Sequence, residues 1–206
     1  MRVDILETEL FSRYFSDVIG KNDLLTVNGV STDSRDIKKG DLFLAIEGEN
    51  FDGSEFVGEA LSGGATYAIV QSGDENHNTF LVDDVILFIG KICSQWMNDF
   101  NGNVIAITGS NGKTTTKDLI SHILSKKGYD VSKTEGNFNT SIGVPLSIFS
   151  FPHNASRVYV LELGANRLGD IEYLSSMVKP DIGVITNISD AHLEGFGSIE
   201  NITKEK

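Results

Sequence analysis

The sequence contains one segment whose residue types and spacing are those of a phosphate-binding loop. Residues 106–116 read Ala-Ile-Thr-Gly-Ser-Asn-Gly-Lys-Thr-Thr-Thr, between an apolar stretch and a region with helical spacing. The glycines let backbone N–H groups turn toward phosphate oxygens, and the start of the following helix adds positive potential. Lys113 can meet the terminal phosphates of a nucleotide, and the Thr114 hydroxyl can reach Mg²⁺.

This loop departs from the strict phosphate-loop pattern at one position. The pattern requires glycine five residues before Gly112, and Ile107 stands there. We therefore predict a variant loop whose first glycine is Gly109, and a glycine-rich turn with a chance Gly-Lys-Thr is the alternative reading. The predicted nucleotide contacts are Gly109, Ser110, Asn111, Gly112, Lys113, Thr114 and Thr115.

Four further polar residues follow predicted elements in the same half of the chain. Glu162 ends the apolar stretch 158–161, where a carboxylate either reaches a metal at the phosphate edge or is an ordinary strand-end acid. Asn139 and Thr140 lie between a predicted strand and a predicted helix, so they cap that helix or contact substrate. His192 follows the last predicted strand and is a candidate metal ligand or acid–base group.

Alternating strands and helices are predicted to bring these residues to one edge of a sheet. Strand patterns occur at 104–108, 130–134, 157–162 and 181–187, and helical patterns at 113–127, 141–149, 168–177 and from 198 onward. This alternation favours a parallel sheet covered on both faces. Right-handed crossovers then place the carboxyl ends of all strands at the edge where ligands bind.

The first hundred residues predict a separate, smaller α/β module. Helical spacing covers 5–18, 54–62 and 84–99, and strand patterns occur at about 30–35, 42–46, 67–70 and 79–82. The net charge of −12 is concentrated there, and Asn101–Asn103 is the best linker candidate. We therefore predict one domain over 1–100 and another over 101–206.

Composition excludes several classes of protein. The acidic first half argues against a general nucleic-acid-binding protein, because such a protein needs a basic face. No run of about 18 apolar residues suggests a membrane span, and no secretory leader pattern is visible. The single cysteine excludes an internal disulfide and a cysteine-clustered zinc site, which agrees with a cytoplasmic location. We expect a monomer.

Several of these segments, in order along nearly the whole chain, resemble the Mur ligases of peptidoglycan synthesis. The segments that carry the resemblance are 31–35, 40–43, 108–116, 136–146, 162–166 and 191–196. The last three are similar in particular to the members of the family that add D-alanyl-D-alanine. The resemblance implies a small N-terminal α/β uridine-binding domain followed by a parallel-sheet P-loop ATP-binding domain.

The resemblance also implies a reaction and its substrates. The reaction is ATP-dependent joining of UDP-N-acetylmuramoyl-tripeptide to D-alanyl-D-alanine through an acyl phosphate, with Mg²⁺ present. Ser31 and Thr32 match the uridine-binding stretch, and Asn139 and Thr140 match a substrate-side stretch.

The implied catalytic and metal-binding residues lie in the second half. Lys113 and Thr114 match the phosphate and Mg²⁺ residues, and Glu162 and His192 match metal ligands. Lys206 falls where the family has a carbamylated lysine, which would make it a further metal ligand, and a solvated lysine is the alternative. The implied catalytic set is Lys113, His192 and Lys206.

Two departures from the family pattern leave alternatives open. Ser54 stands where relatives often have histidine, and the family continues beyond the position of Lys206. We therefore expect an incomplete central domain and no ligase activity from the isolated chain. The alternatives are another ligase of the family, such as the diamino-acid-adding enzyme, and a non-catalytic nucleotide-binding module. A GTPase switch would need an Asn-Lys-x-Asp segment, which the sequence lacks.

Overall fold

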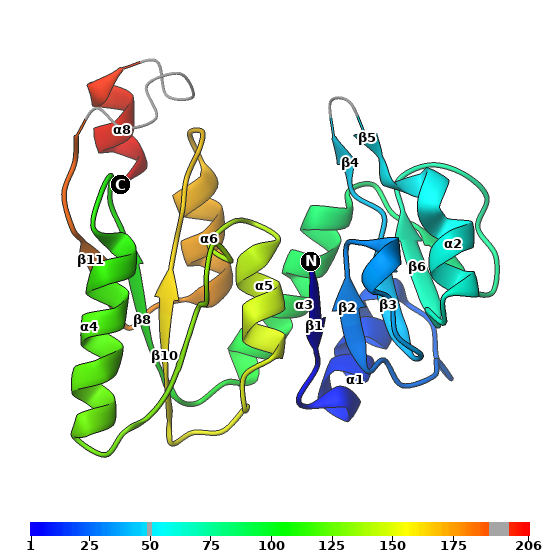
Figure 1. Cartoon of the computed structure of the whole chain (residues 1–206), viewed down its shortest axis with the longest axis horizontal. Helices are drawn as coiled ribbons and strands as arrows, with labels where there is room; N and C mark the ends of the chain where they lie inside the picture. The colour runs from blue at the N-terminus through cyan, green and yellow to red at the C-terminus, as the bar shows by residue number, and fades with distance from the viewer. Residues whose placement is uncertain (49–50, 190–197) are drawn as a thin grey trace. The chain divides into compact units, whose positions relative to one another are not determined.

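The computed structural model describes residues 1–48, 51–189 and 198–206, which pack as two compact units (Figure 1). The first unit comprises Met1–Trp96 with Phe149–Phe151, and the second comprises Met97–Ile148 with Pro152–Lys206. Helix α3 (Val85–Asp99) contains the point where the first unit ends and the second begins. The domain division at residue 100 stays a prediction.

Within the described residues, the first unit is built on a five-stranded sheet in the order β1-β2-β3-β6-β7. Strand β1 pairs antiparallel with β2, and the other neighbours pair in parallel. The elements of this sheet are β1 (Arg2–Asp4), β2 (Gly29–Ser31), β3 (Asp41–Leu44), β6 (Tyr67–Val70) and β7 (Thr79–Leu81). The other elements of the unit are α1 (Thr8–Ile19), the 3₁₀ turns η1 (Ser34–Asp36) and η2 (Gly53–Phe56), α2 (Val57–Ser62), and the antiparallel pair β4 (Glu47–Gly48) and β5 (Phe51–Asp52).

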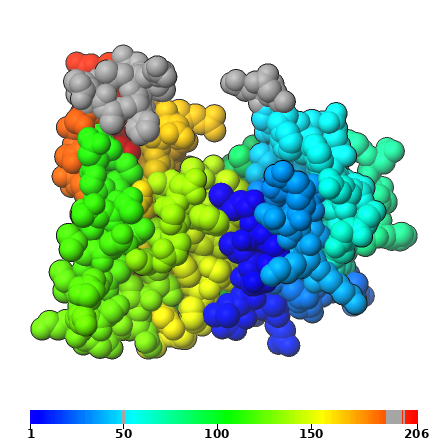
Figure 2. Space-filling view, viewed as in Figure 1, coloured from blue at the N-terminus to red at the C-terminus, as the bar shows by residue number. Residues whose placement is uncertain are grey.

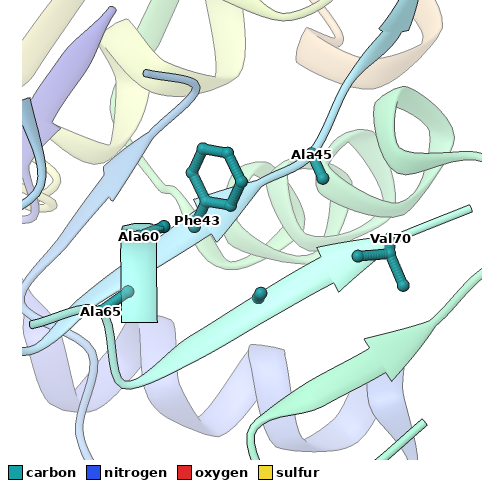
Figure 3. Close-up of a cluster of buried hydrophobic side chains, with 6 residues drawn as sticks. Phe43, Ala45, Ala60, Ala65 and Val70 are labelled. Atoms are coloured by element: carbon teal, nitrogen blue, oxygen red, sulfur yellow. The ribbon is translucent and has the colours of Figure 1, made fainter. Parts of the chain in front are cut away.

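Both faces of this sheet are buried. Phe43 and Val70 lie on the face that packs against Ala60 of α2 (Figure 3). On the other face, the ring of Phe15 from α1 lies 5.6 Å from that of Tyr67 and 6.1 Å from that of Phe88 in α3. Burial on both faces explains why these strands read as continuous apolar runs.

A buried ion pair fixes the start of the chain to this sheet. The guanidinium of Arg2 donates to both carboxylate oxygens of Asp41, at 2.7 and 3.0 Å. The backbone N–H of Lys38 donates to the same carboxylate at 2.8 Å. Asp41 is fully buried. Strand β1 and the β4–β5 pair were not predicted, because these short segments contain no apolar run and mix charged residues and glycine with single apolar ones.

The second unit has a parallel sheet, as predicted, and its strand order is β11-β8-β10-β9. Its strands are β8 (Asn103–Thr108), β9 (Asp130–Lys133), β10 (Arg157–Glu162) and β11 (Ile182–Ile185). The helices are α4 (Lys113–Lys126), α5 (Gly143–Phe149), α6 (Asp170–Val178) and α8 (Ile199–Glu205). Each lies within a few residues of its predicted range.

Side chains alternate between the two faces of this sheet. Ile107 and Val160 pack against α4, whose Ile120 and Leu124 reach the same cluster. Tyr159 points to the opposite face because successive side chains of a strand alternate, and it is also fully buried. The outer side of α4, in green, is at the surface in the space-filling view (Figure 2). Both faces of the sheet are therefore covered at β8 and β10, as the strand–helix alternation predicts, whereas Ile182 and Ile185 of the edge strand β11 are exposed.

The register of the strands brings their carboxyl ends together. Glu162 of β10 pairs with Ile107 of β8, and Ile185 of β11 pairs with Thr108. Lys133, the last residue of β9, pairs with Val160. The residues that directly follow these strands therefore gather at one edge.

Candidate nucleotide and metal site

The phosphate loop connects β8 to α4 in the predicted strand–loop–helix arrangement. Gly109 and Gly112 have φ values of 140° and 78°, a region that favours glycine. Helix α4 begins directly at Lys113. The Lys113 ammonium donates to the carbonyl oxygens of Gly109 at 2.8 Å and Ser110 at 3.3 Å. The side chain thus folds back over its own loop, where a phosphate would meet it.

A segment that follows β11 holds the loop from the side. The backbone N–H groups of Ser110 and Asn111 donate to the carbonyl and side-chain oxygens of Asn187, at 3.0 and 3.1 Å. The side-chain amide of Asn187 donates back to the carbonyl of Asn111 at 3.0 Å, and the hydroxyl of Ser110 donates to the Ser189 carbonyl. Phosphate contact by the N–H groups of Ser110 and Asn111 would replace their bonds to Asn187. Asn187 was not predicted as a site residue, although its place at the end of the last predicted strand is a signal for this edge.

Glu162 is the centre of a polar cluster beside the loop. Its side-chain oxygens accept hydrogen bonds from the Thr114 hydroxyl and from the Asn139 amide, both at 2.8 Å. Its backbone N–H donates to the hydroxyl of Thr134 at 3.0 Å. Only 3% of Glu162 is exposed. The structure thus brings Thr114, Glu162 and Asn139 together, and Asn139 contacts Glu162, which the sequence did not predict.

Thr140 has the capping role that the sequence offered as one of two readings. Its hydroxyl accepts a hydrogen bond from the N–H of Gly143, the first residue of α5, at 3.2 Å. Thr140 also lines a pocket of about 300 Å³ in this unit. The other lining residues are Ser141, Gly164, Asn166, Arg167, Asp170 and Leu174.

Lys206 also reaches the phosphate loop. Its ammonium donates to the hydroxyl of Thr108 at 3.2 Å. Burial lowers the pKa of Lys206 below its usual value, and the positive charge of Lys113 lowers it further, against the opposing effect of Glu205. The lowered pKa favours the neutral amine, which is the form that reacts with CO₂.

The neighbouring Glu205 fixes the end of α8. Its carboxylate accepts hydrogen bonds from the N–H groups of Gly169 and Ile171, at 2.7 and 2.6 Å, at the start of α6. A carboxylate is favoured there because helix N-termini carry unpaired N–H groups and positive potential. This anchor holds Lys206 beside the loop.

The predicted metal ligands fit Mg²⁺ in chemistry. Glu162 and Thr114 provide oxygen atoms, which this cation prefers. Within 1–48, 51–189 and 198–206, no group of three or more His, Cys, Asp and Glu side chains gathers in one place. The predicted ligand His192 lies outside the described residues. The predicted set is therefore described only for Thr114, Glu162 and Lys206.

The predicted uridine contacts belong to the first unit. Thr32 lines a pocket of about 500 Å³, together with Asp33, Ser34, Arg35, Phe43, Phe51, Phe56 and Glu59. The rings of Phe51 and Phe56 stack at 5.3 Å. Ser31 is fully buried, and its hydroxyl donates to the Asp33 carbonyl at 2.9 Å instead of facing this pocket. A hydrogen bond from Arg35 holds the pKa of Asp33 well below its usual range, so its carboxylate is charged.

A parallel sheet, a glycine-rich loop that enters a helix at Lys-Thr, and an acidic residue at the end of the adjacent strand define a P-loop nucleotide-binding protein. Two family models cover most of the chain. Residues 26–105 match the model of the Mur ligase family catalytic domain, and residues 107–206 match that of the Mur ligase middle domain. The chain belongs to the Mur ligase family.

A curated relative and two solved structures illustrate this membership. The UDP-N-acetylmuramoyl-tripeptide–D-alanyl-D-alanine ligase of Bacillus subtilis (strain 168) is 40% identical over 184 residues, which are 87% of this chain and 40% of that protein. MurF from Acinetobacter baumannii superposes with a TM-score of 0.82 at 33% identity, covering 94% of this chain and 44% of that one. MurF ligase from Thermotoga maritima in complex with ADP has a TM-score of 0.77 at 38% identity, covering 85% and 41%.

The chain spans 40% of the length of the Bacillus subtilis relative. In the parts of the chain that the structure describes, no helix has both the length and the apolar character needed to cross a membrane.

Proposed function

We propose that this chain carries the nucleotide and donor-substrate sites of an ATP-dependent ligase that adds D-alanyl-D-alanine to UDP-N-acetylmuramoyl-tripeptide. The observation that carries the proposal is the 2.8 Å contact between Thr114 and Glu162 beside Lys113. This contact sets a hydroxyl and a carboxylate at the phosphate loop, where a metal–nucleotide complex would bind. The choice of substrates is supported by those for which the Bacillus subtilis relative is named.

The reaction needs ATP because a carboxylate is a poor acyl donor. The terminal carboxylate of the donor attacks the γ-phosphorus of ATP, its oxygen forms the new P–O bond, and ADP leaves with the electrons of the broken one. The amine of D-alanyl-D-alanine then attacks the acyl carbon, loses a proton, and expels phosphate. Two anions meet in the first step, so Lys113 and the start of α4 stabilise it by offsetting their repulsion.

Thr114, Glu162, His192 and a carbamylated Lys206 would hold Mg²⁺. When bound, the metal neutralises charge on the phosphates and orients them for in-line attack. The Lys206 carbamate would form when the neutral amine attacks the carbon of CO₂ and releases a proton, so that a cation becomes an anion. The lowered pKa of Lys206 supports this step because more of the amine is neutral.

The pocket of the first unit is proposed to bind the uridine end of the donor. Thr32 and backbone groups offer hydrogen bonds to a neutral base, and the stacked Phe51 and Phe56 offer an aromatic surface. We propose that the protein acts in the cytoplasm, which agrees with its single cysteine, and that it acts as a monomer.

Binding of donor analogues to the 206-residue chain tests this proposal. In isothermal titration calorimetry with Mg²⁺ and ADP present, we expect UDP-N-acetylmuramoyl-tripeptide to bind about tenfold more tightly than UDP alone, or about 1.4 kcal/mol. We also expect the dipeptide donor used by the diamino-acid-adding ligase to bind more weakly than the tripeptide. A tripeptide donor that binds no better than UDP would contradict the proposal, and preference for the dipeptide would favour the sister enzyme.

A further inference from the structure

A buried lysine lies one turn beyond the phosphate loop. Only 2% of the Lys117 side chain on α4 is exposed, although lysine is rarely buried to this extent. Its ammonium donates to the carbonyl oxygen of Thr134 at 2.8 Å. The carboxylate of Asp118 lies 3.6 Å away and is bonded more closely to Lys133, at 2.8 Å. A buried charge is costly, so the contact with Thr134 calls for a physical reason.

Thr134 connects this lysine to the site. It directly follows β9, is 1% exposed, and donates its N–H to the carbonyl of Val160 at 3.2 Å. Its hydroxyl accepts the hydrogen bond from the N–H of Glu162. One residue therefore receives the Lys117 ammonium on its carbonyl and holds the backbone of Glu162 with its hydroxyl.

Helix α4 is thus tied to the strand ends at two places. Thr114 contacts the carboxylate of Glu162 directly, and Lys117 contacts Thr134 three residues further along. The segment that starts at Thr134 continues to Asn139, which donates to the other oxygen of Glu162. Movement of Thr134 would therefore displace both the backbone and a side-chain partner of Glu162.

We propose that Lys117 is a positioning residue for the metal–nucleotide site. It holds Thr134 so that the Glu162 carboxylate, which accepts from the Asn139 amide, meets Thr114 at the phosphate loop. The inference rests on the proposed function, since it assigns Lys117 to the same site. It differs from a purely structural role because it predicts a change in the Mg²⁺ dependence of nucleotide binding and not only in stability.

The test is Lys117→Met in the 206-residue chain, with Lys126→Met as the matched control. Lys126 lies in the same helix and is exposed. Methionine keeps the length and apolar stem of Lys117 but removes the donor. We expect the Mg²⁺ concentration that half-saturates ADP binding to rise about tenfold in Lys117→Met. The affinity for ADP in EDTA should change less than about twofold in both variants, since Lys117 does not contact the phosphate loop.

Two Thr134 variants test the second link if Lys117→Met does not fold. Thr134→Val removes the hydroxyl that holds Glu162 but keeps the carbonyl that receives Lys117, and it should raise the Mg²⁺ requirement in the same way. Thr134→Ser keeps both groups and should behave as the unmodified chain. Hydrogen-exchange mass spectrometry should show faster exchange over 134–140 in Lys117→Met than in Lys126→Met.

The outcomes separate this inference from the proposed function. If the unmodified chain binds ADP with Mg²⁺ but Lys117→Met or Thr134→Val has the same Mg²⁺ requirement, the inference is wrong and the proposed function stands. If the unmodified chain binds no nucleotide, the proposed function fails and takes the inference with it. An equal rise in Lys126→Met would also overturn the inference, because the effect would then not depend on the buried contact.

Discussion

Glu162→Gln should separate the stability of the second unit from its binding of metal and nucleotide. Glutamine can keep both contacts, since its oxygen can accept from Asn139 and its amide can donate to the Thr114 hydroxyl. Two hydrogen bonds to a charged group become neutral ones, a loss of about 2 kcal/mol in total. Taking a carboxylate out of water costs several kcal/mol, and the amide avoids that cost. Glu162→Gln should therefore be at least as stable as the unmodified chain.

The effect on binding should have the opposite sign. Removal of one negative charge from the proposed Mg²⁺ site should cost on the order of 3 kcal/mol, by analogy with loss of one charge-stabilising group. The Mg²⁺ concentration that half-saturates ADP binding should then rise about 100-fold. Titration calorimetry over a series of Mg²⁺ concentrations measures this, and thermal unfolding without Mg²⁺ measures stability.

Glu135→Gln is the matched control, because Glu135 lies on the adjacent segment with 77% of its side chain exposed. It should change neither quantity beyond the small effects of surface charges, about 0.5 kcal/mol. An unchanged Mg²⁺ requirement in Glu162→Gln would refute the metal role of this carboxylate. A melting temperature of Glu162→Gln lower by more than about 5 °C would refute the expectation that glutamine keeps both hydrogen bonds, because that drop corresponds to more than about 1 kcal/mol of stability.

The remaining predictions concern single residues in each unit. Lys113→Ala should weaken binding of Mg²⁺–ADP by about 2 kcal/mol or more, because a charged contact with phosphate is lost, and equal affinity by calorimetry would contradict its role. Asp41→Asn should lower the free energy of unfolding by about 3 kcal/mol in urea unfolding, since it removes the buried counter-charge of Arg2 and leaves only the exposed carboxylate of Asp4 to pair with the guanidinium. Glu75→Gln, in the exposed pair with Lys21, should cost less than about 0.5 kcal/mol. Burial raises the pKa of the Cys93 thiol, so little thiolate should form when the pH rises through the ordinary pKa of a cysteine. Iodoacetamide should therefore label Cys93 only after unfolding. Rapid labelling of the folded chain at pH 9 would show that the packing around α3 is wrong.

Long periodic segments explain why the sequence predicted most of this fold. The strand before the phosphate loop is a continuous apolar run, and the helix after it carries apolar residues such as Ile120 and Leu124 at helical spacing, so the type of each is readable. Strand β1 escaped prediction because Val3 is its single apolar residue, and it is held by the pair of Arg2 with Asp41 from another strand. Contacts between segments far apart in the chain cannot be read from local spacing.

The same reason explains the residues of the site that the sequence did not reveal. The phosphate loop, Glu162 and Thr114 have a recognisable position relative to strand ends. Asn187 holds the loop from 76 residues away. A signal for Lys117 was present, since it lies on the face of α4 that also carries Ile120 and Leu124. A lysine on an apolar helix face usually packs its aliphatic part along that face and keeps its ammonium in solvent, so only the structure identifies the contact of Lys117 with Thr134.

We claim that the loop from Gly109 to Thr115, together with Glu162, forms a metal-dependent nucleotide site. Titration of ADP into the 206-residue chain, with and without Mg²⁺, is the direct test. We predict saturable binding that is strengthened by Mg²⁺ and is weakened in both Lys113→Ala and Glu162→Gln while their melting temperatures stay close to that of the unmodified chain. No binding by the folded chain, or binding that neither Mg²⁺ nor these two substitutions alter, would contradict the claim.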